Sequence, residues 1–406
     1  MFHSNTESGP PHILVINAGS SSLKFALYEA TKLLQLRLRG KFERIGLSDT
    51  TFTVDASTGT RTRVPAEGVS DHASAARALE DWLDQARLRS AVQAVGHRVV
   101  HGGERYGSPA RIDGELVKAL LEITPFSPEH LPMEIALIEY FLQHFPNAAQ
   151  VVCFDTNFHR HMPRVAQLLP IPRRYDRKGL RRYGFHGLSY AYLMEELERA
   201  AGTHTARGRV VLAHLGNGSS LAAVRQGQSV DTTMALTPAS GIPMGTRSGD
   251  LDPGLAWCLA HTENMDTEGF HRMVNHESGL AGISETSSDM SDLLASETAD
   301  VRAAEAVALY CYQVTKSIGA LCAALGGLDT LVFSGGIGEN SPPIRQRICE
   351  RLGFLGVTID ANKNAMNDAV ISADAAAISV CVIRTDEEAM IARSTQRVLG
   401  EHAVFA

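Results

Sequence analysis

The chain has 406 residues, 44% of them hydrophobic and 20% charged, and its formal net charge is −7. This length suffices for two domains with large cores, and the composition is ordinary for a globular protein. The acidic balance disfavours nucleic acid as a partner, and no apolar run approaches the length that spans a membrane. The six cysteines form no Cys-x-x-Cys pair, which argues against a zinc or redox site. Residues 1–12 lack an apolar core, so we expect no signal peptide and a cytoplasmic protein.

The first predicted element is a hairpin with a small polar turn. The apolar runs 13–16 and 23–28 indicate two paired strands. The turn between them, residues 17–22, holds a glycine, an asparagine and three serines, and Lys24 lies just beyond. Backbone N–H groups of small residues can approach an anion closely, hydroxyls add donors, and a lysine adds a point charge. The turn therefore favours phosphate binding, with an ordinary polar turn as the alternative.

Between this hairpin and residue 155 the sequence predicts further strands and several helices. Residues 33–54 alternate weakly and indicate one or two strands, and residues 61–71 read as a polar connection. Apolar spacing predicts helices over 74–86, 114–122 and 133–144, and strands over 91–100 and 149–154. Asp155 directly follows the last strand, at the end where ligands collect in α/β sheets. Its alternative role is to cap the next segment.

Isolated basic residues mark two places in the first half of the chain. Arg98 lies where a strand runs into a Gly-Gly pair, and alone it could equally form a structural ion pair. Residues 155–187 are rich in His and Arg, show little periodicity, and end with His186 in a Gly-Phe-His-Gly sequence. Such a segment in an acidic protein indicates either a solvated surface or an anion site, and a lone His186 is more often a core histidine.

Residues 209–224 repeat the pattern of the first hairpin. An apolar strand leads into His-Leu-Gly-Asn-Gly-Ser-Ser (214–220), and a second strand returns. Two such units indicate an internal duplication, with two similar halves facing each other across a cleft. The Gly- and Pro-rich loop 238–254 then carries Arg247.

The C-terminal part predicts a third glycine-rich turn beside a strand. A long Ala-rich helix over 301–325 precedes a strand at 330–333, which leads into Ser-Gly-Gly-Ile-Gly-Glu-Asn (334–340) and a helix over 342–352. A strand, a glycine-rich turn and a helix start form a nucleotide-binding geometry. A strand over 377–383 and a final helix end the chain. Phosphoryl transfer needs N–H groups around phosphates, cations and a magnesium ligand, and the motifs together offer all three.

The chain resembles the acetokinase family, the acetate kinases, within the superfamily of sugar kinases, actin and heat-shock ATPases. The resemblance covers about residues 13–393 and rests on Asn-Ala-Gly-Ser-Ser-Ser-Leu-Lys (17–24), His-Arg-Val-Val-His-Gly-Gly (97–103), Phe-Asp-Thr (154–156), Tyr-Gly-Phe-His-Gly (183–187), His-Leu-Gly-Asn-Gly-Ser-Ser (214–220), Met-Gly-Thr-Arg-Ser-Gly-Asp (244–250) and Gly-Ile-Gly-Glu-Asn-Ser (336–341). It implies an α/β fold of two duplicated ribonuclease-H-like domains, as in actin-like ATPases, with a central cleft. The expected domains are residues 1–157, completed by a C-terminal helix 389–406, and residues 158–388, which would bind the nucleotide and form a homodimer.

The resemblance also implies a role for each matched residue. The catalytic set would be Asp155, His186, Arg247 and Arg98. Arg98 would also bind the substrate carboxylate, and an apolar pocket for the substrate methyl group would contain Val100, Phe185 and Pro238. Magnesium, or manganese, would be held by Asn17 and Glu387. The nucleotide would contact Ser20, Ser22, Lys24, His214, Leu215, Gly216, Asn217, Gly218, Asp289, Met290, Ser291, Gly336, Ile337, Gly338, Glu339 and Asn340.

The implied reaction is reversible phosphoryl transfer from ATP to acetate, which gives acetyl phosphate and ADP. Acetate is already an anion at neutral pH, so Asp155 need not act as a general base and is expected to position magnesium or the attacking group. The sequence departs from the family pattern in four places near the expected site. Leu188 and Tyr190 replace Thr and His, Ser127 replaces a His, Met290 and Ser291 replace Phe and Arg, and Ala239 and Ser240 replace Leu and Glu.

Three alternatives follow from these departures. A propionate or butyrate kinase differs only in chain length, which a pocket separates weakly. Pyrophosphate as phosphoryl donor is a second alternative, because Ser291 removes a cation from the nucleotide site. The third, from another class, is a non-catalytic paralogue that binds nucleotide or acyl phosphate, and the retained catalytic residues argue against it.

Overall fold

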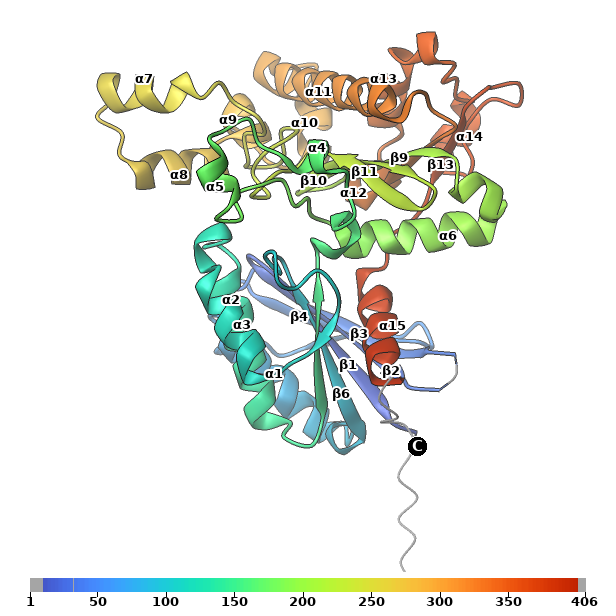
Figure 1. Cartoon of the computed structure of the whole chain (residues 1–406). Coiled ribbons are helices and arrows are strands. Elements are labelled where there is room, and N and C mark those ends of the chain that lie inside the picture. The colour runs from blue at the N-terminus through green and yellow to red at the C-terminus, as the bar shows by residue number, and fades with distance from the viewer. Residues whose placement is uncertain (1–9, 32, 401–406) are drawn as a thin grey trace, which may run out of the picture. The chain divides into compact units, whose positions relative to one another are not determined.

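The computed structural model describes residues 10–31 and 33–400 and divides the chain into two compact units, shown in Figure 1. Unit 1 comprises Met1–Asn157 and Asp386–Ala406, and unit 2 comprises Phe158–Thr385. The chain thus returns to unit 1 at Asp386, whereas the sequence placed this return at residue 389. Residues 1–9 of the segment 1–12, which we expected to hold no signal peptide, lie outside the described residues. Residues 401–406 of the predicted C-terminal helix also lie outside them.

Unit 1 is built on an eight-stranded sheet with the order β5-β4-β3-β2-β1-β6-β8-β7. The strands are β1 (His12–Gly19), β2 (Ser22–Glu29), β3 (Gln35–Glu43), β4 (Thr51–Ala56), β5 (Arg61–Val64), β6 (Val92–Val99), β7 (Ala110–Arg111) and β8 (Ala149–Phe154). β1 pairs antiparallel with β2 and parallel with β6, and β6 pairs parallel with β8. The sequence prediction of a polar connection over 61–71 was wrong at its start, because β5 pairs there with β4.

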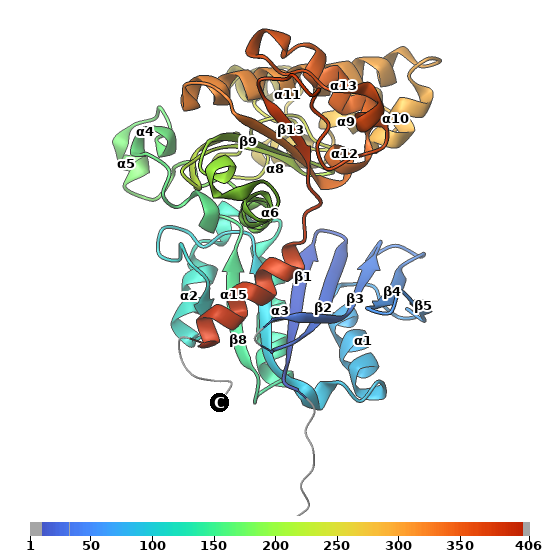
Figure 2. The same ribbon diagram turned by 90° about the vertical axis from the view of Figure 1, so that its right-hand side faces the viewer.

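Helices cover both faces of this sheet. α1 (His72–Gln85) and α3 (Leu131–His144) pack on one face, with α2 (Gly114–Glu122) beside α3, and α15 (Glu387–Gly400) packs across β1, β6 and β8 (Figures 1 and 2). Coverage on both faces explains why β1 and β8 are buried along nearly their whole length. Asp71 and Asp113 cap the first turns of α1 and α2 through their side chains.

Unit 2 is built on a five-stranded sheet with the order β11-β10-β9-β12-β13. The strands are β9 (Arg209–Leu215), β10 (Ser219–Arg225), β11 (Gln228–Thr232), β12 (Thr330–Ser334) and β13 (Ser379–Val382). The helices are α4 (Arg164–Gln167), α5 (Arg173–Asp176), α6 (Gly187–Ala206), α7 (Gly254–Thr262), α8 (Thr267–His276), α9 (Gly279–Ser284), α10 (Met290–Ser296), α11 (Val301–Leu325), α12 (Gly335–Asn340), α13 (Pro342–Glu350) and α14 (Ala361–Ala365). One sheet face packs against α11 with α9, α10 and α13, and the other against α6 (Figure 1).

The two sheets share one topology, which is the expected internal duplication. In unit 1 the consecutive strands β3-β2-β1-β6-β8 repeat the order and the pairing directions of β11-β10-β9-β12-β13 in unit 2. Each begins with a hairpin whose first strand then pairs parallel with a later strand. The prediction of two duplicated α/β domains is therefore correct.

The glycine-rich segment 334–340 differs from its prediction as a turn. Helix α12 begins directly at Gly335, whose φ of +76° permits the sharp change of direction after β12. A Cβ at Gly335 would lie 2.6 Å from the backbone oxygen of Leu215, so only glycine fits here. Among the described residues, no helix is both long and apolar enough to span a membrane.

Candidate active site

In unit 1, a buried ion pair joins the ends of two neighbouring parallel strands. Arg98 near the end of β6 donates from Nε and Nη2 to Oδ2 of Asp155, at 3.0 and 2.6 Å, and Asp155 follows β8. Nη1 of Arg98 donates to the carbonyl oxygen of Ala18 on β1, at 2.8 Å. These hydrogen bonds use three of the five guanidinium N–H bonds.

Glu134 is a third charged group at this site, and the sequence analysis missed it. It lies in the first turn of α3 with its side chain only 2% exposed, and Oε1 is 3.6 Å from Nη1 of Arg98. Oε2 accepts a hydrogen bond from the backbone N–H of Val100 at 3.0 Å. Burial raises the pKa of Glu134 to about 7, although Arg98 opposes the shift. The local sequence does not identify Glu134 as a site residue, because helical spacing predicts only which residues share one face of the helix.

Asp155 is buried with an incomplete set of partners. Its Oδ1 atom is inaccessible and has no hydrogen-bond partner among the described residues. Burial, reinforced by the charge of Glu387, raises the pKa of Asp155 to about 6 against the opposing effect of Arg98. A buried carboxylate oxygen without a partner is costly unless a cation or donor joins it.

Asn17 links the first hairpin to the start of α15. Its Nδ2 donates to Glu387 Oε2 at 3.0 Å and to Glu388 Oε1 at 2.7 Å. Burial raises the pKa of Glu388, and the charge of nearby Lys24 opposes this. The described residues contain no group of three or more His, Cys, Asp or Glu side chains arranged to hold a metal. Carboxylates with raised pKa values and an unpartnered Asp155 oxygen nevertheless fit a divalent cation that keeps most of its water ligands.

The predicted phosphate-binding turn is a two-residue turn between β1 and β2. Ser20 and Lys24 are exposed and Ser22 is half-buried. The carbonyl oxygen of Gly19 accepts a hydrogen bond from Nε2 of His72 at 2.8 Å, which ties the turn to α1. The hydroxyls and the lysine therefore stand at the same end of the sheet as Asn17.

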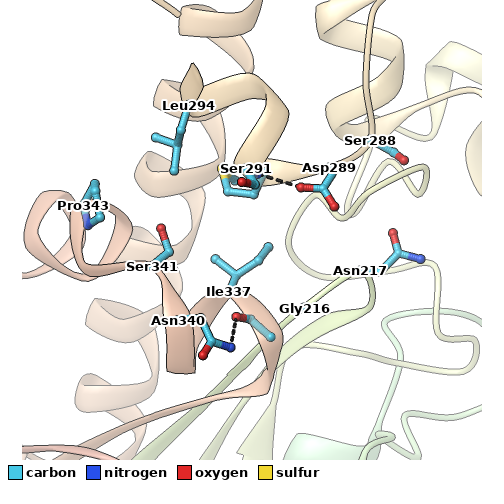
Figure 3. Close-up of a pocket in the computed structure, with 12 residues that line it drawn as sticks. Gly216, Asn217, Ser288, Asp289, Ser291, Leu294, Ile337, Asn340, Ser341 and Pro343 are labelled. Atoms are coloured by element: carbon cyan, nitrogen blue, oxygen red, sulfur yellow. Dashed lines mark hydrogen bonds between the residues drawn. The ribbon is translucent and has the colours of Figure 1, made fainter. Parts of the chain in front are cut away.

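In unit 2, a cavity of about 690 Å³ opens between the β9–β10 turn and helices α10, α12 and α13 (Figure 3). Eight of its lining residues were predicted to contact a nucleotide: Gly216, Asn217, Asp289, Met290, Ser291, Gly336, Ile337 and Asn340. Four others were not predicted: Ser288, Leu294, Ser341 and Pro343. The cavity volume falls within the roughly 300–1,000 Å³ typical of small-molecule sites.

The remaining predicted nucleotide residues of unit 2 do not line this cavity. Leu215 is fully buried in the core beneath α11, and Gly338 accepts a hydrogen bond from the buried Arg345. Glu339 Oε1 accepts hydrogen bonds from the backbone N–H groups of Gly335 and Thr385 at 3.0 and 3.1 Å. These residues hold the α12 segment in place, whereas their neighbour Gly336 lines the cavity. Ile337 and Asn340 also face the cavity (Figure 3).

His186 and His214 form a stacked pair next to the glycine turn of β9–β10. Their ring centroids are 4.4 Å apart with an interplanar angle of 25°. Nδ1 of His186 is 2.8 Å from Ser220 Oγ, and Nδ1 of His214 is 2.9 Å from Ser189 Oγ. His186 precedes α6 in the left-handed region, with φ of +57°, a conformation that non-glycine residues hold mainly where the surroundings require it.

Arg247 lies beside the same turn. A Cβ at Gly218 would be 3.3 Å from Nε2 of His186 and 3.7 Å from Nη1 of Arg247, so both groups border Gly218. Nη1 of Arg247 also donates to the carbonyl oxygen of Pro238 at 3.1 Å. The structure thus gathers two predicted catalytic residues, His186 and Arg247, within unit 2, next to the cavity-lining turn.

The predicted substrate pocket is divided between the units. Val100 is buried in unit 1, and Phe185 and Pro238 belong to unit 2, so a pocket shared by all three stays a prediction. Ser127, predicted to stand in place of a histidine, is buried in unit 1 with Oγ 3.5 Å from Nδ1 of His130. The structure therefore places another histidine beside the substituted position.

Comparison with known proteins supplies the family. The model of the acetokinase family matches residues 12–393. The chain belongs to the acetokinase family. An acetate kinase of Rhodopseudomonas palustris (strain TIE-1) is 42% identical over 393 residues, or 95% of this chain and 98% of that protein. A propionate kinase of Citrobacter rodentium is 41% identical over 400 residues, or 97% and 98% of the two chains.

A solved acetokinase-type structure confirms the fold. The propionate kinase of Francisella tularensis aligns with a TM-score of 0.88 at 33% identity, covering 96% of this chain and 100% of that one. The fold and family resemblance drawn from the sequence are therefore correct. The chain is a kinase of this family, and its relatives include proteins named for two different acids.

Proposed function

We propose that this acetokinase-family protein transfers the γ-phosphoryl group of ATP to acetate and yields acetyl phosphate and ADP. The observation that carries the proposal is Arg98, a buried cation at the ends of two parallel strands, whose hydrogen bonds use three of its five N–H bonds. A guanidinium with two adjacent N–H bonds suits a carboxylate, which it binds in a bidentate manner.

The nucleotide would occupy the cavity of unit 2. Its volume of about 690 Å³ exceeds what a diphosphate alone requires, and its lining includes apolar side chains such as Ile337 and Leu294 for a base. This favours ATP over pyrophosphate as the phosphoryl donor, even though Ser291 supplies no charge at the cavity wall. The turn residues Ser20, Ser22 and Lys24 would contact phosphate groups.

The charges around Arg98 support a divalent cation. Asp155, Glu134 and Glu387 all act on this one guanidinium, so an incoming acetate would add a further negative charge. Asn17 and Glu387, with the unpartnered Oδ1 of Asp155, would hold Mg²⁺, which commonly takes one or two carboxylates and several waters. The bound ion would supply positive charge for the transferring phosphoryl group.

The chain's own residues account for the other requirements of the reaction. An acetate oxygen forms the new bond to the γ-phosphorus, the bond from phosphorus to the β,γ-bridging oxygen breaks, and ADP leaves with that electron pair. The nucleophile has no proton to lose, so neither Asp155 nor Glu134 needs to act as a base. Arg247 and His186 would donate hydrogen bonds to the phosphoryl oxygens as charge spreads over them.

Propionate or butyrate is the alternative substrate, since a propionate kinase is among the similar proteins. One methylene is worth only about 1–3 kcal/mol in a pocket, so the two acids would differ in rate by roughly 10- to 200-fold at most. A non-catalytic nucleotide-binding role is the alternative from another class.

We further propose, on the family resemblance, that the protein is cytoplasmic and forms a homodimer. Sedimentation would test whether the homodimer forms.

Acyl-phosphate formation tests the proposal directly. The full chain is incubated with ATP, Mg²⁺ and acetate, propionate or butyrate, and acyl phosphate is trapped as a hydroxamate. We expect activity with acetate that is lost in Arg98→Ala and retained in Arg61→Ala, a matched arginine whose pair with Asp55 is exposed. Activity with propionate alone would identify the alternative substrate. Absence of product with every acid and with pyrophosphate as donor, in protein that binds ATP, would favour the non-catalytic role.

A further inference from the structure

Tyr190, Ser220 and His186 form a continuous hydrogen-bonded chain inside unit 2. Tyr190 lies one helical turn after His186 on α6 and is fully buried between α6 and the sheet. Its hydroxyl oxygen is 2.5 Å from Ser220 Oγ on β10, which in turn is 2.8 Å from Nδ1 of His186. Ser220 is also fully buried. The catalytic roles proposed above use His186 but leave the other two residues without a function.

The hydrogens of this chain follow from the rule that buried donors need acceptors. If Nδ1 of His186 carries no hydrogen, Tyr190 donates to Ser220 and Ser220 donates to Nδ1, so both hydroxyls are satisfied. If Nδ1 carries a hydrogen, Ser220 must accept it, and one hydroxyl hydrogen then finds no acceptor among the three groups. A buried unpaired donor is costly, so the arrangement favours a neutral imidazole with its hydrogen on Nε2.

Tyr190 contributes to this preference through the oxygen of Ser220. A phenol is a better hydrogen-bond donor than an alkyl hydroxyl, so Tyr190 donates and Ser220 accepts. That bond fills one acceptor position of Ser220, restrains its rotation and strengthens its own O–H as a donor toward Nδ1. Without the phenol, Ser220 would turn more freely between donating to His186 and accepting from it.

The Nε2 atom of His186 lies where a donor would matter. It borders Gly218 together with Nη1 of Arg247, in the turn whose residues Gly216 and Asn217 line the cavity. The titratable and charged groups that face His186 include the stacked ring of His214, which is bonded to Ser189, the ring of Tyr190, and Arg247 beside Gly218. An N–H at this place would stabilise an anionic oxygen, whereas a bare ring nitrogen would repel it.

We propose that Tyr190 is a positioning residue that acts through Ser220 to hold His186 in the Nε2–H form required to donate to the phosphoryl group. The inference rests on the proposed function only for the role of His186 in transfer. The hydrogen-bonded chain and its effect on the tautomer stand independently, and this permits two separate readouts.

The tautomer is measured first, on the full chain labelled with ¹⁵N-histidine. A His186→Asn variant assigns the resonances, and the ring-nitrogen shifts distinguish the two tautomers. We expect the Nε2–H form in the parent protein and a larger Nδ1–H share in both Tyr190→Phe and Ser220→Ala. A parent protein with hydrogen on Nδ1, or tautomers unchanged in both variants, would overturn the proposal.

A kinetic double-mutant cycle tests the route of action. We expect Tyr190→Phe to lower kcat about tenfold, below the roughly 10²–10³-fold loss of a whole donor, while the KM values for ATP and acetate change less than about twofold. In a Ser220→Ala background, Tyr190→Phe should have no further effect, because Tyr190 acts only through Ser220. If the kcat losses of the two single variants multiply in the double variant, this route of action is refuted.

Tyr310 offers a matched control. It is fully buried, and its hydroxyl oxygen is 2.9 Å from Oγ of Ser219, the neighbour of Ser220 on β10. Ser219 bonds Gly216 instead of an imidazole. Tyr310→Phe removes the same group from the other sheet face, so the His186 tautomer should stay unchanged and any kinetic effect should be additive with Ser220→Ala. If the parent protein forms no acyl phosphate, the proposed function fails, yet the tautomer experiment still decides the inference.

Discussion

The two hairpins at the centres of the two units have the same topology but different side chains at the neighbouring strand ends. Beside β1–β2 the parallel strands end in Arg98 and Asp155, with Glu134 and Glu387 acting on the same guanidinium. Beside β9–β10 the neighbouring strand, β12, ends in a serine and leads into a glycine-rich helix start, of which Gly336 faces a cavity. The comparison indicates that a duplicated fold can place a cluster of buried charged groups at the strand ends of one copy and a cavity at the strand ends of the other. What differs is the side chains at the strand ends, because the backbone pairing is shared.

The largest expected effect comes from removing the cations, one in each unit. Arg98→Ala and Arg247→Ala should each lower kcat/KM by about 10²–10³-fold or more, since each deletes charge-assisted hydrogen bonds to an anion. Hydroxamate kinetics measure the loss, and circular dichroism checks that the fold survives. Near-parental turnover in either variant would remove that residue from the proposed site.

A substitution beneath the unit 2 cavity should have a smaller effect and should alter the KM for the nucleotide alone. Arg345 is fully buried and donates to the carbonyl oxygens of Gly338 and Glu339 and to Asn364 and Asn367, which fixes the end of α12. Arg345→Lys cannot make this fork of hydrogen bonds, so the KM for ATP should rise about tenfold while that for acetate changes little. Arg347→Lys is the control, because Arg347 pairs with Glu297 away from α12. Equal changes in both KM values would contradict this division of roles.

From the raised pKa of Glu134 in unit 1 we predict an unusual dependence of stability on pH. The pKa of Glu134 rises on folding from its ordinary value of 4.5 to about 7, so the folded state binds more protons and loses stability as pH increases through this window. The shift corresponds to roughly 3 kcal/mol. Glu134→Gln should therefore flatten the fall in the free energy of unfolding between about pH 5 and pH 8, measured by urea denaturation. An unchanged pH dependence in this variant would show that Glu134 does not titrate in that range.

The smallest effect is expected from restoring a cation to the cavity wall. Ser291 lies at the start of α10, where its N–H donates to Asp289 Oδ1 at 2.7 Å, and its side chain borders the cavity (Figure 3). Ser291→Arg should lower the KM for ATP a few-fold through an exposed contact, with kcat nearly constant. Ser296→Arg, at the other end of the same helix, is the control. A gain for pyrophosphate instead of ATP would argue that phosphate, not the nucleoside, occupies this wall.

Short-range patterns in the sequence predicted much of the fold. The apolar runs of β1, β8, β9 and β12 were evident because strands covered on both faces are continuously hydrophobic. Asp155 was predicted to be a site residue because it directly follows one of these strands. The segment 61–64 was misjudged, since β5 is an exposed edge strand with no apolar alternation. The start of α12 at Gly335 was also missed, because glycine is a poor helix former and the close approach of Leu215 becomes evident only in three dimensions.

The sequence by itself determined the family, the duplicated α/β fold and the motif residues, because each motif is a local run whose spacing carries its chemistry. Only the tertiary structure decided which groups meet. Glu134 reaches Arg98 from a helix, Tyr190 reaches His186 through a strand serine, and Ser288, Leu294, Ser341 and Pro343 complete a cavity. Glu134 and Ser220 lie at least 30 residues from the groups that they contact, and the side chains involved have no periodic signature. Their roles arise from burial and charge, which depend on packing between elements and not on local sequence.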